Sequence, residues 1–338
     1  MSNSLHAVLN PRQLDNFCKL FNLKEGDIEA NFNGWHKLVL MTKDTVFMFP
    51  RSPEYADAVS KEPTLYEEFA HVQSVALPRL VKRVHDKEIS YYEFGAITRL
   101  RGVAFSSVID DLSTDQLKPF LVELARITAD WHSIPLAKLP SILTRTIDDG
   151  GPVTLENWGV KALTSASSSL AVDFMYSLVV SQVTKPDSIL LDETQVKVLW
   201  CGALSELAAL DHVLVHADIH EDQLLVDPHT RGIAAVLDWE SARIDNPVWD
   251  FDFGEWGLEI WKWTDDFAAM RQAIWSTYCT SRGLAIRPHG LHLFYTLCEI
   301  TRNEMQKDKS VLPMTSRGYV DSVALYLTKL EEIQKSLS

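Results

Sequence analysis

VHADIHEDQLLVDPHTRGIAAVLDWE, residues 215–240, is the stretch of sequence that decides the fold. An apolar run ends at Val215, shortly before Asp218, and a second run, 233–237, ends directly before Asp238. A third run, 224–226, lies between them, and the polar turn 227–232 predicts that it forms a hairpin with the run before Asp238. Both carboxylates are therefore expected at strand ends rather than on the solvated face of a helix.

The residues that follow these strands suit phosphoryl transfer. This reaction needs a carboxylate that orients the attacking hydroxyl and accepts its proton, and oxygen ligands that hold Mg²⁺ against the nucleotide phosphates. Asp218, the amide of Gln223 five residues later and Asp238 across the hairpin satisfy both needs. The three histidines at 212, 216 and 220 are spaced as on a helix, but the apolar run between them indicates a strand. We therefore expect no transition-metal site, and assign His216 a structural hydrogen bond beneath Asp218.

The rest of the chain predicts an α+β protein. Up to Gly102 the pattern indicates a small sheet with helices, and beyond it the pattern is mainly helical. Ser113 is a suitable N-cap for the first long helix of that part, and Pro63 is expected to kink or start the earlier one. The expected strands are 38–41, 45–49, 79–84, 88–100, 213–215, 224–226 and 233–237; the expected helices begin near Pro11 and cover 55–71, 116–132, 168–183 and 193–210, with three more after residue 255.

These segments together resemble the aminoglycoside phosphotransferase family of small-molecule kinases, which includes macrolide phosphotransferases. The resemblance covers most of the chain, roughly residues 34–250. Its motifs are His216-x-Asp218-x₄-Gln223, Leu237-Asp238-Trp239-Glu240, Asn246-Pro247-x₂-Asp250 and Trp131-His132-Ser133-Ile134-Pro135, and the segments 47–51, 61–62 and 97–102 are similar to the family as well. It implies a protein-kinase-like fold of two lobes. We expect a nucleotide-binding lobe over 1–101 and a helical lobe over 102–338 that carries the catalytic segment and the acceptor site.

The resemblance also implies roles for individual residues. Asp218 is the expected catalytic base, and Asp238 and Gln223 are the expected Mg²⁺ ligands. Gln223 stands where the family usually has Asn, and its extra methylene is expected to weaken metal binding, because Mg²⁺ tolerates poor octahedral geometry badly. Asp250 is expected to hold the loop after Asp238 by accepting backbone hydrogen bonds.

The expected nucleotide site shows a sharper departure from the family. Met48 occupies the strand position at which the family usually has a Lys or Arg that contacts phosphates, although the expected ion-pair partner, Glu62, is retained. Lys37 or Arg51 is expected to supply the missing cation, or else the phosphates are held less tightly. The remaining residues predicted to contact ATP or GTP are Gly34, in a turn without a Gly-rich cradle, and Ile97 and Thr98, in the segment that resembles the hinge between the lobes.

The acceptor is expected to be a small hydroxyl compound that carries an amine. Aromatic and acidic residues alternate over 249–263 and can bind a cation through ring faces and carboxylates. Most of these side chains are expected to pack in the core or face water. Asp222, Glu255 and Trp256 are the residues we expect to contact the acceptor, and the excess acid is expected on the helical lobe.

Composition excludes other classes of partner. The 338 residues carry 32 Lys and Arg against 46 Asp and Glu, a net charge of −14, whereas nucleic acids and anionic membranes need a basic footprint. No signal-peptide pattern or apolar stretch of membrane-spanning length is visible, and the four cysteines form no C-x-x-C pair. We expect a cytoplasmic enzyme with reduced thiols. Two alternatives stay open: a metabolite kinase for an amino alcohol or sugar, and a nucleotide-binding regulatory protein without useful turnover.

Overall fold

The computed structural model describes residues 5–32, 34, 36–69, 76–164, 167–183, 193–251, 267–285 and 294. The chain divides into two compact units. Unit 1 contains residues 1–108, 137–143 and 222–242, and unit 2 contains residues 109–136, 144–221 and 243–338. Each unit is described separately below. The prediction that nucleotide binding belongs to 1–101 and the acceptor site to 102–338 stays a prediction.

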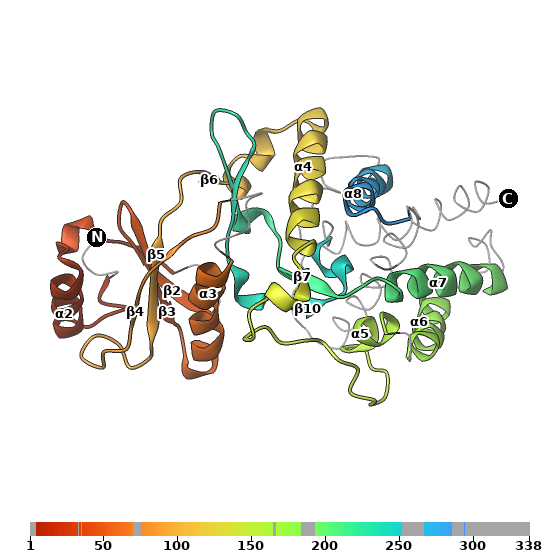
Figure 1. Ribbon diagram of the computed structural model, residues 1–338, viewed down its shortest axis with the longest axis horizontal. Helices are drawn as coiled ribbons and strands as arrows, with labels where there is room; N and C mark the ends of the chain where they lie inside the picture. Colours follow the sequence, from red (N-terminus) through yellow and green to blue (C-terminus); the bar gives the residue numbers. More distant parts are fainter. Residues whose placement is uncertain are drawn as a thin grey trace. The chain divides into compact units, whose positions relative to one another are not determined.

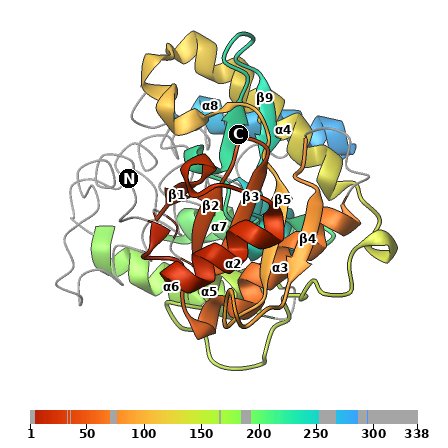
Figure 2. The same cartoon turned by 90° about the vertical axis from the view of Figure 1, so that its left-hand side faces the viewer.

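Unit 1 is built on an antiparallel sheet of five strands in the order β1-β2-β3-β5-β4. Two helices cover its faces, α2 on one side and α3 on the other (Figures 1 and 2). A second sheet has the order β6-β8-β9. The bounds are α2 Pro11–Phe21, β1 Glu29–Asn31, β2 Lys37–Met41, β3 Thr45–Pro50, α3 Ala56–Glu68, β4 Leu80–Val84, β5 Phe94–Thr98, β6 Val103–Ala104, β8 Leu224–Val226 and β9 Ile233–Val236.

Alternation along β3 decides what each face of the large sheet holds. Phe47 and Phe49 point to the α2 face, where the ring of Phe47 lies 4.8 Å from that of Phe17, centroid to centroid. Met48, between them, therefore lies on the α3 face. Val39 of β2 pairs with Met48, so Val39 and its second neighbour Lys37 share this face as well. The register thus places Lys37 under α3.

Helix α3 begins at Ala56 and continues through Pro63, so the alternative that the helix begins at Pro63 is wrong. Pro63 lies at the start of its third turn and packs directly on β5. A Cβ at Gly95 would approach Pro63 Cγ to 2.5 Å, so only glycine admits this helix at this distance from the strand. The close packing brings the α3 side chains to the sheet residues on the same face.

Unit 2 combines helices with one short ribbon. The predicted N-terminus of α4 is confirmed: the Ser113 amide donates to Gln116 Oε1 at 3.0 Å, which completes a capping box. Helix α4 packs against α8, and β7 pairs antiparallel with β10. The bounds are α4 Thr114–His132, α5 Trp158–Ala162, α6 Ser168–Val183, α7 Glu193–Ala208, β7 Val213–Val215, β10 Arg243–Asp245 and α8 Phe267–Arg282. Of the helices in the described ranges, none has both the length and the apolarity needed to cross a lipid bilayer.

Candidate active site

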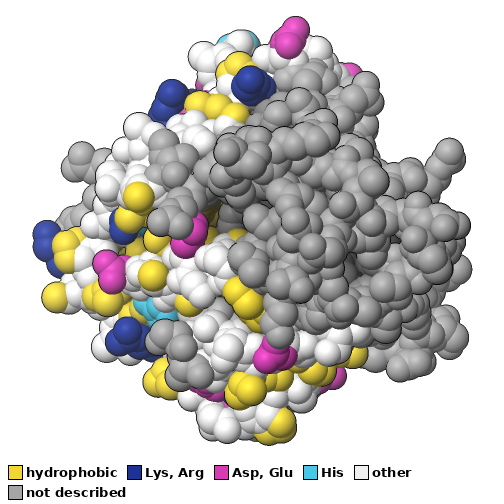
Figure 3. Space-filling model, turned by 90° about the vertical axis from the view of Figure 1, so that its right-hand side faces the viewer, with side chains coloured by type: hydrophobic (Ala, Val, Ile, Leu, Met, Phe, Trp, Pro, Cys, Tyr) yellow, Lys and Arg dark blue, Asp and Glu magenta, His cyan; other side chains and the backbone are white. Residues whose placement is uncertain are grey.

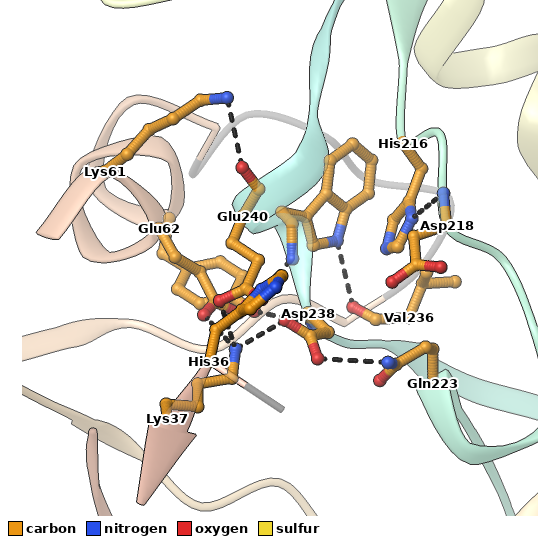
Figure 4. A network of polar contacts seen from close by, with 12 residues as sticks. His36, Lys37, Lys61, Glu62, His216, Asp218, Gln223, Val236, Asp238 and Glu240 are labelled. Atoms are coloured by element: carbon orange, nitrogen blue, oxygen red, sulfur yellow. Dashed lines mark hydrogen bonds and ion pairs between the residues drawn. The ribbon is translucent and has the colours of Figure 1, made fainter. Parts of the chain in front are cut away.

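The hairpin of β8 and β9 brings the two predicted metal ligands together. Leu224 pairs with Val236, and one residue further out the Leu237 amide donates to the Gln223 carbonyl at 2.8 Å. Asp238 follows in the left-handed conformation, at φ 66°, and its Oδ2 accepts from Gln223 Nε2 at 3.0 Å (Figure 4). The predicted hairpin is therefore confirmed, and it places an amide and a carboxylate side by side.

Lys37 faces these ligands from β2. Its ammonium donates to Glu62 Oε2 on α3 at 2.6 Å and also to Asp238 Oδ1 (Figure 4). Burial by itself lowers the pKa of Lys37, but the carboxylates of Glu62, Asp238 and Glu240 outweigh it and raise the pKa above the usual value, so this lysine stays charged. Of the two cations considered as substitutes for the residue replaced by Met48, the structure thus pairs Lys37 with Glu62.

Arg51 has a different task. Its guanidinium donates through Nη2 to the carbonyls of Phe32 at 2.6 Å and Gly34 at 2.8 Å, and so holds the turn that precedes β2. Gly34 is required in that turn, because a Cβ there would lie 2.7 Å from the Lys37 carbonyl oxygen. Arg51 and Gly34 therefore shape the start of the strand that carries Lys37.

The other predicted nucleotide residues lie on the same sheet. Met48 is buried on β3, and Ile97 and Thr98 end β5. Ile97 is buried, whereas Thr98 Oγ1 accepts from the Arg79 amide at 2.9 Å. Asp222 is an exposed residue just before β8, and Glu255 and Trp256 lie outside the described residues.

Three residues on α3 hold the loop of Asp238, and sequence reasoning identified only one of them, Glu62. Tyr66 donates its hydroxyl to Glu62 Oε1 and accepts from the Asp238 amide at 3.2 Å. Glu62 Oε1 also accepts from the Trp239 amide at 3.2 Å, and Lys61 Nζ donates to the Glu240 carbonyl at 3.2 Å. Tyr66 stands four residues after Glu62, the helical spacing at which two side chains meet, and this signal was available in the sequence.

Unit 2 presents Asp218 at the end of β7. Asp218 is exposed, and its amide donates to Nδ1 of the buried His216 at 3.2 Å, which confirms the structural role expected for that histidine. Ala217, between them, has a φ of 66°, a left-handed conformation that costs a residue with a Cβ about 1–2 kcal/mol. A loop with this geometry needs support from its surroundings.

Asp250 supplies that support. Its Oδ1 accepts from the Ala217 amide at 2.7 Å and its Oδ2 from the His216 amide at 3.0 Å. Asp250 thus accepts backbone hydrogen bonds as predicted, but they hold the loop before Asp218 and not the loop after Asp238. Asn246 caps the short 3₁₀ segment Pro247–Asp250 by accepting from the Val248 amide, and this sets Asp250 behind β7. The spacing of the motif could not predict which groups donate to Asp250. Its donors include backbone amides, which nearly every residue carries, so residue types do not identify them.

Two side chains of α4 complete the Asp250 site. Trp131 Nε1 lies 3.0 Å and His132 Nε2 2.9 Å from Asp250 Oδ2. Burial alone would raise the pKa of Asp250, but the hydrogen bonds from His132 and from the Ala217 amide keep that pKa below its usual range. Burial in turn lowers the pKa of His132, which remains neutral. The buried carboxylate is thus ionised and satisfied by donors.

The predicted concentration of acid on the helical part finds no support on the face that Figure 3 shows. On its described surface, acidic and basic side chains are scattered singly and neither sign forms a patch (Figure 3). The argument for an amine-bearing acceptor therefore gains nothing from charge on this face.

Comparisons with known proteins identify a family and a fold. The model of the phosphotransferase enzyme family matches residues 32–287. Among solved structures, a GDP and kanamycin complex of an aminoglycoside phosphotransferase is 18% identical, with 96% of this chain and 98% of that chain covered and a TM-score of 0.54. The macrolide 2′-phosphotransferase of Brachybacterium faecium is 15% identical, with 93% and 97% covered and a TM-score of 0.52. An ADP-bound aminoglycoside phosphotransferase is 13% identical, with 93% and 97% covered and a TM-score of 0.53. A search of curated proteins finds no match.

Proposed function

The chain belongs to the phosphotransferase enzyme family, with the kinase-like α+β fold of that family, and on this premise we propose that it transfers the γ-phosphoryl group of ATP or GTP to a hydroxyl of a small, amine-bearing compound. The observation that carries the proposal is the buried ion pair of Lys37 and Glu62 beside Asp238 and Gln223. A charged ammonium, an acid that orients it and two oxygen-bearing ligands are the parts that phosphoryl transfer requires of the nucleotide site.

Asp218 is the base in the proposed reaction. Its carboxylate accepts the proton of the acceptor hydroxyl, whose oxygen forms the new bond to the γ-phosphorus. The bond from that phosphorus to the oxygen bridging it to the β-phosphate breaks, and the electron pair leaves with the nucleoside diphosphate. Exposure of Asp218, and the fixed loop on which Asp250 holds it, support this role.

Asp238 and Gln223 would hold Mg²⁺, since carboxylate and amide oxygens are the donors that this ion prefers. Held there, the ion would neutralise charge that develops on the phosphates. Lys37 supports the same phosphates from β2, and Glu62 keeps its ammonium in place. This pairing supports turnover over mere nucleotide binding, because the replacement of the usual strand cation by Met48 was, with Gln223, one of the two reasons to expect a protein without useful turnover.

The acceptor class rests on the family and on two of the solved structures named above. One of these is a complex with kanamycin, and the other is a macrolide phosphotransferase. Kanamycin, as an aminoglycoside, carries amines. A metabolite kinase for an amino alcohol or sugar uses the same residues, so the acceptor must be identified by experiment.

The test is a phosphotransfer screen with the purified full chain. Aminoglycosides, macrolides and amino alcohols are incubated with ATP or GTP and Mg²⁺, and products are detected as a mass increase of one phosphate. The wild type is expected to phosphorylate at least one acceptor, and Asp218→Asn is expected to lower that rate by about 10²–10⁴-fold. Unchanged turnover in this variant would remove Asp218 from the mechanism, and no product with any acceptor would contradict the proposed function.

A further inference from the structure

The charges around Lys37 do not balance. Glu62, Asp238 and Glu240 each bring a ligand oxygen to within 4.8 Å of the others, and the one ammonium of Lys37 lies at ion-pair distance from all three (Figure 4). Three carboxylates and one ammonium carry a formal charge of −2, the charge that one divalent cation neutralises. An excess of buried negative charge is costly unless a cation or hydrogen bonds compensate it.

Glu240 is the member of this cluster that the proposed function does not use. Its side chain is 8% exposed, and its Oε1 lies 2.5 Å from His36 Nδ1. Its Oε2 is buried, has no hydrogen-bond partner, and lies at ion-pair distance from Lys37 Nζ, 3.3 Å away. Lys61 fixes the backbone here by donating to the carbonyls of Glu240 and Ala242. A positioned carboxylate oxygen therefore faces the cluster with free acceptor capacity.

Gln223 does not present an oxygen beside Asp238, and Glu240 can supply the missing metal ligand. The amide of Gln223 turns its Nε2 toward Asp238 Oδ2, at 3.0 Å, and so presents a donor to the carboxylate beside it. To act as a metal ligand, the amide must turn its oxygen the same way. A carboxylate is the stronger ligand for a hard divalent cation, and Glu240 already lies within reach of Asp238.

We propose that Glu240 is a carboxylate ligand of the divalent cation together with Asp238, and that this cation and Lys37 share the acidic cluster. The inference rests on the proposed function, because Asp238 is taken from there as a metal ligand. An ammonium has three N–H donors, and Lys37 Nζ faces three carboxylates. When a divalent cation takes over Glu240 and one oxygen of Asp238, an N–H of Lys37 becomes available to a nucleotide phosphate.

The experiment measures metal binding without any phosphotransfer. Mn²⁺, a divalent cation that accepts carboxylate ligands, is titrated into the full chain with and without ADP, and the free ion is followed by electron paramagnetic resonance. Glu240→Gln is expected to raise the Kd for Mn²⁺ by about tenfold or more, at least the effect of losing an outer-shell partner. Glu240→Asp, which keeps the charge on a shorter side chain, is expected to lie between this variant and the wild type.

Two control variants separate ligation from other effects. His36→Gln removes the outer-shell partner of Glu240 and leaves all carboxylates in place, so it is expected to raise the Kd for Mn²⁺ less than Glu240→Gln does. Glu88→Gln removes an exposed carboxylate of unit 1 and is expected to have no effect. Thermal unfolding of each variant verifies that it is folded.

The outcomes distinguish the two proposals. If Glu240→Gln binds Mn²⁺ like the wild type while Asp238→Asn binds it weakly, Glu240 is not a ligand and the inference is overturned, whereas the proposed function stands. If Asp238→Asn also leaves the Kd unchanged, or if the wild type binds no Mn²⁺ in either condition, the metal site of the proposed function fails together with the inference.

Discussion

Two buried acidic centres, one in each unit, satisfy their carboxylates in opposite ways. In unit 2, one carboxylate, Asp250, accepts from two backbone amides, an indole and a neutral imidazole. In unit 1, three carboxylates surround one ammonium, that of Lys37. The first centre has donors enough for its charge, and the second has more negative charge than its own cation compensates.

The difference shows that buried carboxylates can either hold a loop in position or favour the binding of a cation. A carboxylate whose donors are complete has no reason to bind anything further, and its hydrogen bonds fix the backbone that they reach. The Asp250 centre therefore positions the loop of Asp218. A centre with surplus charge favours the binding of cations, and in unit 1 this surplus lies beside Gln223 and Asp238. Each centre predicts a different response to substitution.

The largest expected effect follows from removing the buried carboxylate of Asp250. Asp250→Ala leaves the amides of His216 and Ala217, together with Trp131 Nε1 and His132 Nε2, without an acceptor. We expect a loss of about 3–5 kcal/mol in the free energy of unfolding, as when a buried charged partner is removed, with phosphotransfer lost as well. Urea denaturation measures the first and the acceptor screen the second.

Asp218→Asn is the matched control for this variant. Its side chain is exposed, so its stability is expected to stay within about 0.5 kcal/mol of the wild type while phosphotransfer is lost. An Asp250→Ala variant as stable as Asp218→Asn would show that the buried carboxylate does not hold the loop.

The second prediction moves the ammonium of unit 1 from β2 to β3. Lys37→Met leaves Glu62 buried without its cation, and we expect a loss of about 3 kcal/mol in stability and about 10²-fold weaker binding of the nucleotide. Adding Met48→Lys places a lysine on the same face of the sheet, opposite Val39 and under α3, and is expected to recover part of both losses. Nucleotide affinity is measured by titration of each variant with Mg²⁺ and ADP.

The double variant is also its own control for folding. If Lys37→Met alone unfolds, recovery in the double variant still reports on the ion pair with Glu62. A Lys37→Met variant that is stable and binds nucleotide like the wild type would show that neither the folding of unit 1 nor nucleotide binding requires the ammonium of this lysine.

Much of the arrangement around these two centres was predictable because it depends on local pattern. The apolar runs and the polar turn 227–232 predicted the hairpin that places Gln223 beside Asp238, and Ser113 predicted the start of α4. The choice between Lys37 and Arg51 was not predictable, because it depends on which carbonyls the turn before β2 presents.

Other features depend on backbone geometry that residue types do not encode. Glu240 joins the cluster because Asp238 adopts a left-handed conformation and Lys61 holds the residues after it. Asp250 holds the loop before Asp218 because a 3₁₀ segment capped by Asn246 sets its position. Both effects act through backbone amides and carbonyls, which every residue carries, so the sequence motifs alone predicted the carboxylates but not their partners.

The third prediction concerns acid sensitivity of the Asp250 centre. The pKa of His132 is lowered in the folded state by burial, so the unfolded chain binds a proton at this histidine at higher pH than the folded chain does. The stability that neutral His132 contributes is present above the unfolded pKa of about 6.5 and is lost as the pH falls toward the folded pKa. His132→Gln keeps a donor for Asp250 and removes the titration. We expect its Tm to fall less than that of the wild type between pH 7 and pH 5.

The pKa of Asp250, also lowered, provides the reference for this comparison. Its contribution is present above the unfolded value of about 3.9 and is lost as the pH falls below it. Wild type and His132→Gln both lose this contribution below about pH 4, so the two proteins are compared in the window above it. Equal slopes of Tm between pH 7 and pH 5 would exclude His132 as the acid-sensitive group.

The smallest expected effect comes from one hydroxyl in each centre. Tyr66 donates to Glu62 and accepts from the Asp238 amide, whereas Tyr278 lies 2.9 Å from His132 Nδ1. Because His132 Nε2 must donate to the carboxylate of Asp250, neutral His132 accepts from Tyr278 through Nδ1. Each Tyr→Phe substitution removes one buried hydroxyl and is expected to cost about 0.5–1.5 kcal/mol in urea denaturation.

The two substitutions should differ in binding rather than in stability. Tyr66→Phe frees the backbone of Asp238 in the centre that has surplus charge, so we expect the Kd for Mn²⁺ to rise about two- to fivefold, a loss of the size of one neutral hydrogen bond. Tyr278→Phe acts on a centre that is already complete, and the Kd for Mn²⁺ is expected to stay unchanged. An equal change in both variants would mean that the hydroxyls act only through global stability, and the functional contrast between the two centres would fail at this point.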